Sequence, residues 1–252
     1  MVESARREER PTIGWYIGAS TQLFARRNSV SPTARFVNSG YTDLRASPAR
    51  DAFEGGLTVA KTLSTMLELG TPAPELNLPD VVSGRTITLA SFKDATALLV
   101  MFICRHCPFV KHVQHELARL GVDYRGRGLG VVAISANDAA SFPDDAPQRL
   151  EEMAGELGFD FPVCYDETQE VAKAYEAACT PDFFLFDKGR RLVYRGQLDD
   201  SRPDSGIPVT GRDLRAAIDA ALSDHPVGAD QRASVGCNIK WKPGNEPRYF
   251  GS

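Results

Sequence analysis

Two cysteines separated by two residues, Cys104 and Cys107, follow a continuous apolar run and precede an amphipathic segment. The thiolate is the reactive form of cysteine, and a helix N-terminus stabilises it through unpaired N–H groups and the helix dipole. The spacing lets the second thiol reach the first within one helical turn. We therefore expect Cys104, at the helix mouth, to be the exposed nucleophile and Cys107, in the first turn, to be the resolving thiol. Pro108 fits the start of such a helix, where no N–H is needed.

The two intervening residues, Arg105 and His106, are candidates for tuning the thiol chemistry. Positive charge from Arg105 and from a protonated His106 would lower the pKa of a neighbouring thiol and favour the dithiol form. A centre whose reduced form is stabilised is the more oxidising one. We therefore predict a reduction potential above that of a general cytosolic reductant.

Half of a zinc site is the main alternative for this motif, because His112 and His115 follow the cysteines. Helical geometry disfavours that site, since residues 104 and 112 would lie about 12 Å apart along one helix. The two histidines are then solvated helix residues, and we assign no metal ligands. A non-catalytic carrier that binds copper or zinc through the same thiols and a histidine remains an alternative.

The elements around the motif alternate between strands and helices. The apolar pattern predicts a hairpin near 81–89, a strand at 97–103, a helix at 107–120 capped by Gly121, a strand at 130–135, a helix at 148–157, a strand at 161–165, a helix at 169–178, a hairpin at 183–195 and a helix opened by a capping box at 210–213. This order predicts an α/β fold with a central mixed sheet flanked by helices and an N-terminal β-hairpin extension.

The two ends of the chain differ from this regular part, which we place at residues 67–226. Residues 1–65 show neither helical period nor strand alternation, so we expect disorder there. An alternative is that the protein itself begins near Met66. Residues 227–252 contain several apolar side chains, which predicts a tail that packs back on the domain.

Composition restricts the function. A net charge of -4 without a basic stripe argues against a nucleic-acid partner, and no apolar run is long enough to predict a membrane span. Five cysteines in 252 residues do not form a disulfide framework, which favours a reducing, cytoplasmic location. The Gly126-Arg127-Gly128 segment precedes a strand rather than opening a helix, so we expect no dinucleotide or phosphate cofactor.

Residues 101–112 (MFICRHCPFVKH), 178–187 (ACTPDFFLFD) and 236–244 (GCNIKWKPG) carry a resemblance to a known family. The chain resembles the peroxiredoxin-like thioredoxin-fold proteins, or redoxins, of the alkyl hydroperoxide reductase and thiol-specific antioxidant group. The resemblance covers about residues 67–250 and implies a thioredoxin fold and thiol redox chemistry. It also implies that Pro181 is a cis-proline lying against the dithiol, and that Thr180 and Pro181 shape a substrate groove by offering backbone for pairing.

The sequence departs from that family at two points. Peroxiredoxins place a threonine three residues before the peroxidatic cysteine, whereas this chain has Cys104 or Met101 there, depending on the cysteine that is aligned. Thioredoxin has a tryptophan directly before its first cysteine and a buried acid six residues before it, whereas this chain has Ile103 and Leu98. Efficient peroxidase activity is therefore in doubt, and the group that moves the proton of the resolving thiol is not identified.

Three further cysteines lie outside the motif. Cys164 alternates with its neighbours in a short strand and is best explained as a core residue. Cys179, two residues before Pro181, is either a core residue or an accessory thiol near the dithiol. Cys237 becomes an accessory thiol if the tail folds over the site, where it could resolve a disulfide or a sulfenic acid on Cys104.

These observations predict a thiol–disulfide oxidoreductase. Cys104 attacks a disulfide to form a mixed disulfide, and Cys107 releases it by a second exchange. The first alternative is a peroxiredoxin-like thiol peroxidase with an antioxidant role. The expected partners are a protein or small-molecule disulfide, or a peroxide, together with an electron donor of the thioredoxin or glutathione type.

Overall fold

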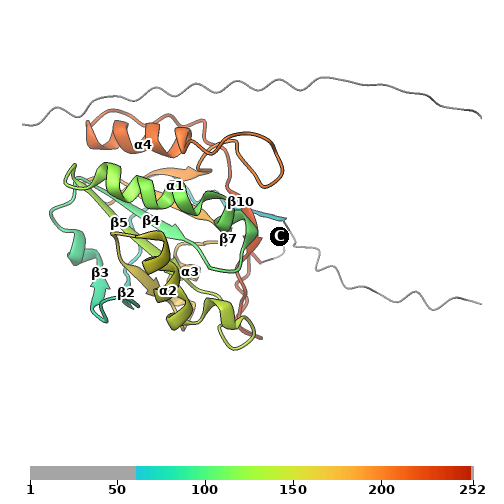
Figure 1. Ribbon diagram of the computed structural model, residues 1–252. Helices are drawn as coiled ribbons and strands as arrows, with labels where there is room; N and C mark the ends of the chain where they lie inside the picture. The colour runs from blue at the N-terminus through green and yellow to red at the C-terminus, as the bar shows by residue number, and fades with distance from the viewer. Residues whose placement is uncertain (1–60, 251–252) are drawn as a thin grey trace, which may run out of the picture. The chain divides into compact units, whose positions relative to one another are not determined.

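A five-stranded mixed sheet forms the centre of the computed structural model, which describes residues 61–250 (Figure 1). Its strands, in spatial order, are β6 (Val163–Tyr165), β5 (Leu129–Ser135), β4 (Ala97–Phe102), β8 (Asp182–Phe186) and β9 (Leu192–Gly196). Strand β5 is parallel to both β4 and β6, whereas β8 is antiparallel to both β4 and β9. The predicted mixed sheet is confirmed. It places the end of β4, and therefore the Cys-x-x-Cys motif, at the middle of one sheet edge.

In the described part of the chain, four α-helices flank this sheet: α1 (Pro108–Tyr124), α2 (Pro147–Leu157), α3 (Glu170–Ala174) and α4 (Arg212–Leu222). None of the helices within residues 61–250 combines the length and the apolar character that a membrane crossing requires. Side chains of α1, α2 and α4 pack in one buried cluster, and α3 contributes to another. The alternating order of strands and helices therefore yields the predicted two-faced α/β arrangement.

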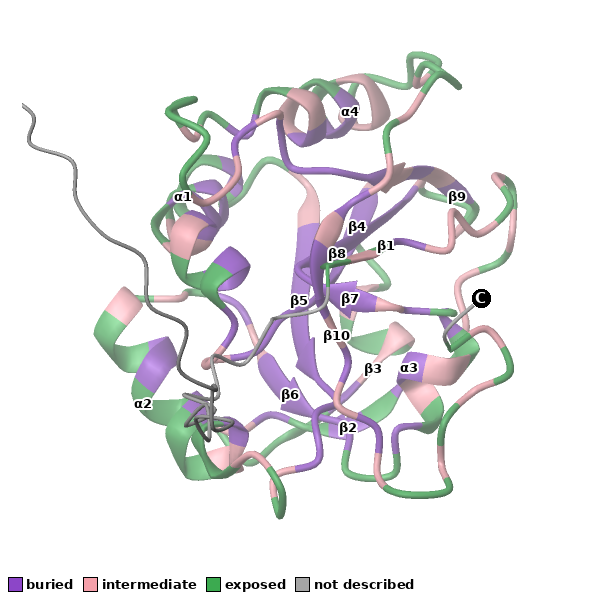
Figure 2. Cartoon of the chain, turned by 90° about the vertical axis from the view of Figure 1, so that its right-hand side faces the viewer, coloured by how far each residue is buried: buried purple, intermediate pink, exposed green. Residues whose placement is uncertain are grey.

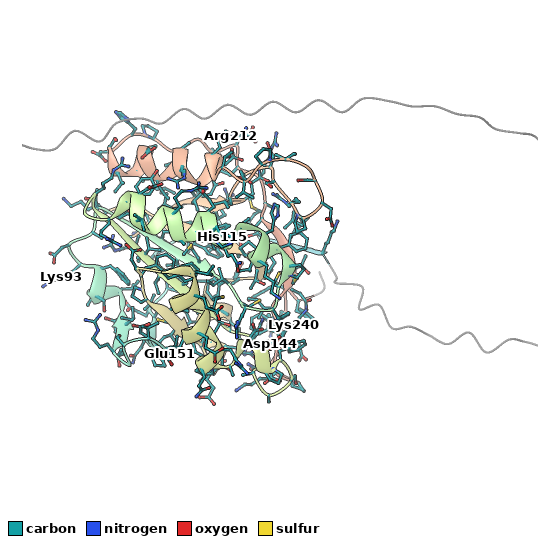
Figure 3. The ribbon with its side chains drawn as sticks, in the orientation of Figure 1. Lys93, His115, Asp144, Glu151, Arg212 and Lys240 are labelled. Atoms are coloured by element: carbon teal, nitrogen blue, oxygen red, sulfur yellow. The ribbon has the colours of Figure 1, made fainter. Side chains whose placement is uncertain are left out.

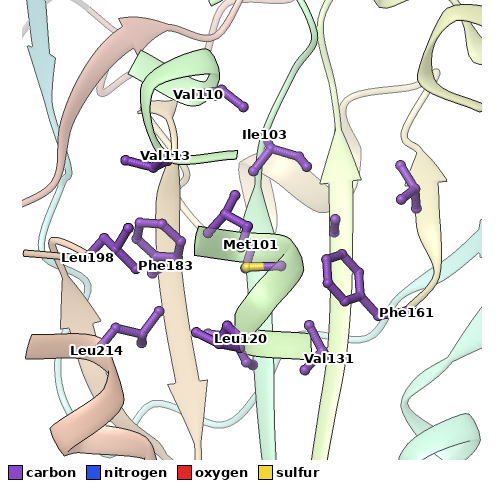
Figure 4. Close-up of a cluster of buried hydrophobic side chains, with 14 of the residues drawn as sticks. Met101, Ile103, Val110, Val113, Leu120, Val131, Phe161, Phe183, Leu198 and Leu214 are labelled. Carbon is purple, nitrogen blue, oxygen red and sulfur yellow. The ribbon is translucent and has the colours of Figure 1, made fainter. Parts of the chain in front are cut away.

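Alternation along β4 explains why the sheet has two hydrophobic faces. Leu99 and Met101 belong to the cluster that α1 and α4 cover, while Leu98, Val100 and Phe102 belong to the cluster on the other face. All five side chains are 0% exposed, as expected of a central strand covered on both sides. Figure 2 shows the buried central strands, and Figure 4 shows side chains of the first cluster. The motif thus follows a rigid strand.

A second, three-stranded sheet joins three distant parts of the chain. In it β10 (Val235–Asn238) lies between β1 (Lys61–Leu63) and β7 (Cys179–Thr180), and both pairings are antiparallel. Strand β1 lies within the segment 1–65 for which we expected disorder, because the pairing with β10 supplies hydrogen bonds that its own sequence pattern does not reveal. Residues 1–60 lie outside the described residues. The predicted N-terminal hairpin is formed by β2 (Asn77–Pro79) and β3 (Thr86–Thr88).

Three predicted helix ends were wrong. Helix α1 continues past Gly121 to Tyr124, so Gly121 does not cap it. Gly121 instead packs closely against another segment, because an added Cβ would lie 2.2 Å from Asp160 Oδ1. Helix α3 is shorter than the predicted 169–178, because the chain turns at Glu176, where φ is 49°, and enters β7. Helix α4 has Gly211 rather than Thr210 as its N-cap, and the Asp199 carboxylate accepts the backbone N–H groups of both residues.

Replacing Gly155 with alanine is expected to stabilise the protein by about 0.5–1 kcal/mol, because glycine in a helix interior loses more backbone entropy on folding than alanine. Gly155 is an exposed residue of α2, and no atom outside its own helix and chain neighbours lies within 4 Å of a Cβ built there. Gly121→Ala is the matched control, and we expect it to destabilise. Chemical denaturation measures both, and an unchanged or lower stability for Gly155→Ala would contradict the helix assignment.

Candidate active site

The Cys-x-x-Cys turn connects β4 directly to α1. The helix begins at Pro108, and Cys107 is its N-cap, with φ -65° and ψ 125°. Cys107 was expected inside the first turn of the helix and is instead its N-cap. The reason is that proline is favoured at the first helical position, which makes the preceding residue the cap. The backbone N–H of Val110, in the first turn, contributes to the low pKa of Cys107.

Both thiols of the motif are enclosed. Cys104 is 1% exposed and Cys107 is 0% exposed, so the expectation of an exposed Cys104 was also wrong. Thr180 contacts both sulfurs: its Oγ1 lies 3.3 Å from Cys104 Sγ, and its carbonyl oxygen accepts a hydrogen bond of 3.2 Å from Cys107 Sγ. The strand that contains Thr180 therefore covers the motif.

The two thiols differ in acidity. Hydrogen bonding with Cys104 and Cys237 lowers the pKa of Cys107 below the ordinary value, with smaller contributions from Thr180 and the backbone N–H of Val110, against the effect of burial. Burial raises the pKa of Cys104, and its hydrogen bond to Cys107 raises it further. Of the two motif thiols, Cys107 therefore has the lower pKa.

The peptide bond between Thr180 and Pro181 is cis, as predicted. The edge of β7 next to it is not open, however. It pairs with β10, and Thr180 lies opposite Cys237 in the register. Gly236 approaches so closely that an added Cβ would be 2.0 Å from Thr180 O. The backbone that we expected to form a substrate groove is thus occupied by the chain's own tail.

Strand β10 brings a third thiol to the motif. Cys237 is 2% exposed, and its Sγ lies 2.7 Å from Cys107 Sγ. The hydrogen bond to Cys107, followed by burial, raises the pKa of Cys237. Cys107 therefore has a thiol on each side, Cys104 and Cys237.

A buried carboxylate, Asp145, holds the turn between the cysteines. It is 0% exposed, and its Oδ1 accepts the backbone N–H groups of Arg105 and His106 at 2.8 Å and 3.2 Å. Its Oδ2 forms a hydrogen bond with His106 Nδ1 and accepts another, of 2.8 Å, from Asn137 Nδ2. Asn137 Oδ1 in turn accepts the backbone N–H of Lys240 in the tail. Asp145 could not be predicted from the sequence, because it lies in an irregular Pro- and Asp-rich loop that has no periodic pattern.

The charges of the two intervening residues are matched by acids. Arg105 forms salt bridges with Glu152 and Glu156 of α2, and His106 pairs with Asp145. Burial opposes ionisation of Asp145, but hydrogen bonds from His106 and Asn137 outweigh it and lower its pKa. The large contributions to the low pKa of Cys107 come from other thiols, Thr180 and a helix amide. The predicted tuning by Arg105 and His106 stays a prediction, and so does the elevated reduction potential.

The model of the Redoxin family matches residues 68–211 of this chain. The chain belongs to the Redoxin family. An uncharacterized conserved protein from Geobacillus kaustophilus is 55% identical, covers 75% of this chain and 100% of its own length, and superposes with a TM-score of 0.73. A hypothetical protein from Sinorhizobium meliloti 1021 is 53% identical over 73% of this chain and 100% of its own length, with a TM-score of 0.72.

A curated relative of this redoxin carries a functional name. Thiol-disulfide oxidoreductase ResA from Geobacillus thermodenitrificans is 24% identical over 133 residues, which cover 52% of this chain and 70% of that protein. The family match and the mixed sheet flanked by helices together establish the predicted thioredoxin fold. The family resemblance found in the sequence is likewise confirmed.

The two remaining cysteines of the redoxin domain are buried away from solvent. Cys164 in β6 is 0% exposed, and burial raises its pKa to about 12. Cys179 in β7 is also 0% exposed, its Sγ donates to Pro181 O at 3.6 Å, and burial raises its pKa. Both thiols are thus held in the neutral form.

The histidines of the zinc alternative do not join the thiols. His112 Nε2 lies 2.7 Å from Ser201 Oγ, and His115 is exposed on α1 (Figure 3). Within residues 61–250 the one group with metal-ligand spacing is Cys104, His106 and Asp145, whose ligand atoms all lie within 4.8 Å of one another. Asp145 is already committed to four hydrogen-bond donors, which leaves it poorly suited to bind an ion.

Unfolding free energy is expected to fall by up to ~4 kcal/mol as pH rises from about 4 to about 7, because of Asp182. Asp182 follows Pro181, is 0% exposed, and burial raises its pKa from 3.8 to about 7. The folded state therefore binds the proton more tightly than the unfolded state, and this stability is lost as pH rises through the folded pKa. Denaturation at several pH values should show a flatter profile for Asp182→Asn than for the wild type. Parallel profiles would contradict the raised pKa.

Proposed function

We propose that this redoxin is a thiol–disulfide oxidoreductase in which Cys107 is the nucleophile and Cys104 is a resolving thiol. The observation that supports this most strongly is the position of Cys107 as N-cap of α1, next to a second thiol and against Thr180 and the cis-proline. A thiolate at a helix N-terminus attacks a disulfide sulfur, and a neighbouring thiol displaces the product. The roles are the reverse of those expected from the sequence alone.

Each step of the proposed exchange uses a group already at the site. Cys107 thiolate forms a bond to one sulfur of the substrate disulfide, and the other sulfur leaves as a thiolate. Cys104 then attacks Cys107 Sγ, which releases the second substrate thiol. Because a ring nitrogen of His106 lies within 4.8 Å of Cys104 Sγ, His106, held in place by Asp145, is the group that we assign to accept its proton.

The proposed substrates are small disulfides rather than extended protein chains. The reason is that β10 already pairs with Thr180, where an extended chain would have to bind. The two motif thiols are also at most 1% exposed, which favours a compact reactant. An electron donor of the thioredoxin or glutathione type would return the protein to its dithiol form. A cytoplasmic location, where such donors keep thiols reduced, is part of the proposal.

Peroxide reduction is the second candidate, and the low pKa of Cys107 favours it. A thiolate attacks one oxygen of hydrogen peroxide, the O–O bond breaks, and the other oxygen leaves as hydroxide, which gives a sulfenic acid. A neighbouring thiol then condenses with the sulfenic acid to a disulfide and releases water. The Thr180 hydroxyl lies 3.3 Å from Cys104 Sγ. It could take the place of the threonine that peroxiredoxins have three residues before the peroxidatic cysteine.

The test compares two substrates with the full-length, fully reduced protein. One is a self-quenched fluorescent derivative of glutathione disulfide, and the other is hydrogen peroxide in a stopped-flow instrument. Cys104→Ala and Cys107→Ala are the test variants. We expect rapid disulfide reduction that is abolished in Cys107→Ala and only reduced in Cys104→Ala, together with slow peroxide consumption. Fast peroxide consumption with little disulfide reduction would overturn the proposal in favour of the peroxidase, and inactivity toward both substrates would overturn both.

A further inference from the structure

The tail strand β10 places Cys237 where it can take part in the chemistry of Cys107. The two sulfurs are 2.7 Å apart, whereas the cysteines lie 130 positions apart in the sequence. We propose that Cys237 is a third redox-active thiol, which resolves intermediates on Cys107 and forms a Cys107–Cys237 disulfide. This inference rests on the proposed function, because it needs a mixed disulfide on Cys107.

The backbone holds this thiol pair in place from both sides. Cys237 pairs with Thr180 in the β10–β7 ladder, and Thr180 O accepts a hydrogen bond from Cys107 Sγ at 3.2 Å. On its other edge β10 pairs with β1, where Lys61 lies opposite Cys237. A strand fixed along both edges holds its side chains in one register, so the contact between the thiols is a built feature of the fold.

Backbone N–H groups at the start of α1 affect the acidity of both Cys107 and Cys237. The backbone N–H of Val110 contributes to the low pKa of Cys107, and that of Phe109 favours the charged form of Cys237. The largest effect that keeps Cys237 protonated is its hydrogen bond to Cys107. That effect disappears once Cys107 is part of a mixed disulfide, because the sulfur is then neutral. Cys237 is thus easier to ionise at the step where its thiolate is needed.

The reaction balances without a further reagent. Cys107 thiolate bonds to one sulfur of the substrate disulfide, and the other sulfur leaves as a thiolate. Cys237 then bonds to Cys107 Sγ, the second substrate sulfur leaves, and it takes the proton that Cys237 loses. Two protein thiols are oxidised and one substrate disulfide is reduced to two thiols. Cys104 remains a free thiol at the end.

Tryptic peptides can identify which thiols are joined. Cleavage after Arg105 separates the two motif cysteines, so Cys104, Cys107 and Cys237 fall in peptides 94–105, 106–111 and 233–240. The reduced full-length protein is mixed with oxidised glutathione, quenched with acid, alkylated, digested and analysed by mass spectrometry. We expect peptides 106–111 and 233–240 to be linked in the main intramolecular disulfide, with Cys104 alkylated.

Two variants sharpen the test. Cys104→Ala should still form the Cys107–Cys237 disulfide and release glutathione. Gly236→Ala keeps all three thiols but places a Cβ 2.0 Å from Thr180 O, so β10 must shift. The displaced thiol should form the disulfide about tenfold or more slowly, since a displacement of about 1 Å between reacting groups can cost that much. Gly228→Ala, where no atom lies within 4 Å of the added Cβ, is the control.

The outcomes separate this inference from the proposed function. Only a Cys104–Cys107 disulfide in the wild type, with Cys237 alkylated throughout and no intramolecular disulfide in Cys104→Ala, would overturn the role of Cys237 and leave the oxidoreductase proposal standing. The absence of any glutathione adduct or disulfide at Cys107 would overturn both. Cys104→Ala leaves the tail unaltered and therefore decides the question even where Gly236→Ala does not fold.

Discussion

Cys107→Ala is expected to lower kcat/KM for a small disulfide by at least about 10³-fold, because it removes the thiolate that starts the exchange. The side chain is fully buried at the start of α1, so alanine leaves only a small cavity in the site. Cys104→Ala should have a smaller effect, since Cys237 can still resolve the mixed disulfide. Initial rates with the fluorescent glutathione disulfide measure both variants.

Cys164→Ala is the matched control for this loss. Cys164 is as buried as Cys107, but it lies in β6 and pairs with Ile134 in the sheet rather than with the motif. The Cys164→Ala variant should reduce the disulfide with the same kcat/KM as the wild type. Equal losses for Cys164→Ala and Cys107→Ala would mean that buried cysteines act through stability alone, which would contradict the assignment of Cys107 as the nucleophile.

Asp145→Asn is expected to destabilise the protein by about 3 kcal/mol, because a buried charged acceptor loses hydrogen bonds that nothing else in the site can replace. The carboxylate accepts the backbone N–H groups of Arg105 and His106 and the side chain of Asn137. An amide nitrogen at the same place would face the Asn137 donor. Chemical denaturation at neutral pH measures the effect. Asp144→Asn, one residue earlier and exposed (Figure 3), should lie within about 0.5 kcal/mol of the wild type.

The effect of Asp145 has a defined pH dependence. The pKa of this carboxyl is lowered from 3.8 in the folded protein, so its stabilisation is present above that value and is lost as pH falls through the folded pKa. The difference between the wild type and Asp145→Asn should therefore shrink in acid. Burial is the first cause of the raised pKa of Cys104, but the Asp145 charge adds to it. Alkylation of Cys104 should then shift to lower pH in the variant, which a merely structural role would not produce.

The elements that position the motif could be predicted because they depend on local patterns. The apolar run that became β4, the stripe of α1 and the Thr180-Pro181 dipeptide are all visible in short windows of sequence. A buried strand has a continuous apolar sequence, and a helix with one buried face has apolar residues every three to four positions. The α/β arrangement and the choice of Cys104 and Cys107 as the reactive pair followed from these patterns, whereas the thioredoxin fold and the cis-proline followed from the family resemblance.

The parts of the site that could not be predicted depend on contacts between distant residues. The pairing of Cys237 with Thr180 joins the tail to the centre of the chain, and the bonds of Asp145 join a loop to the motif. Neither set of contacts produces a periodic pattern in the sequence. The exchange of roles that we propose for the cysteines follows from one local difference, since the helix was expected to begin at Cys107 and begins at Pro108. That shift of one residue makes Cys107 the N-cap of the helix.

The most direct test of the central claim is to trap the mixed disulfide. The Cys104→Ala/Cys237→Ala double variant keeps Cys107 and removes both thiols that contact it. After reaction with oxidised glutathione at neutral pH, we predict a stable glutathione adduct on peptide 106–111. In the Cys107→Ala variant we predict no adduct on peptide 94–105. An adduct on Cys104 in the absence of Cys107, or none on Cys107 in the double variant, would contradict the assignment of Cys107 as the attacking thiolate.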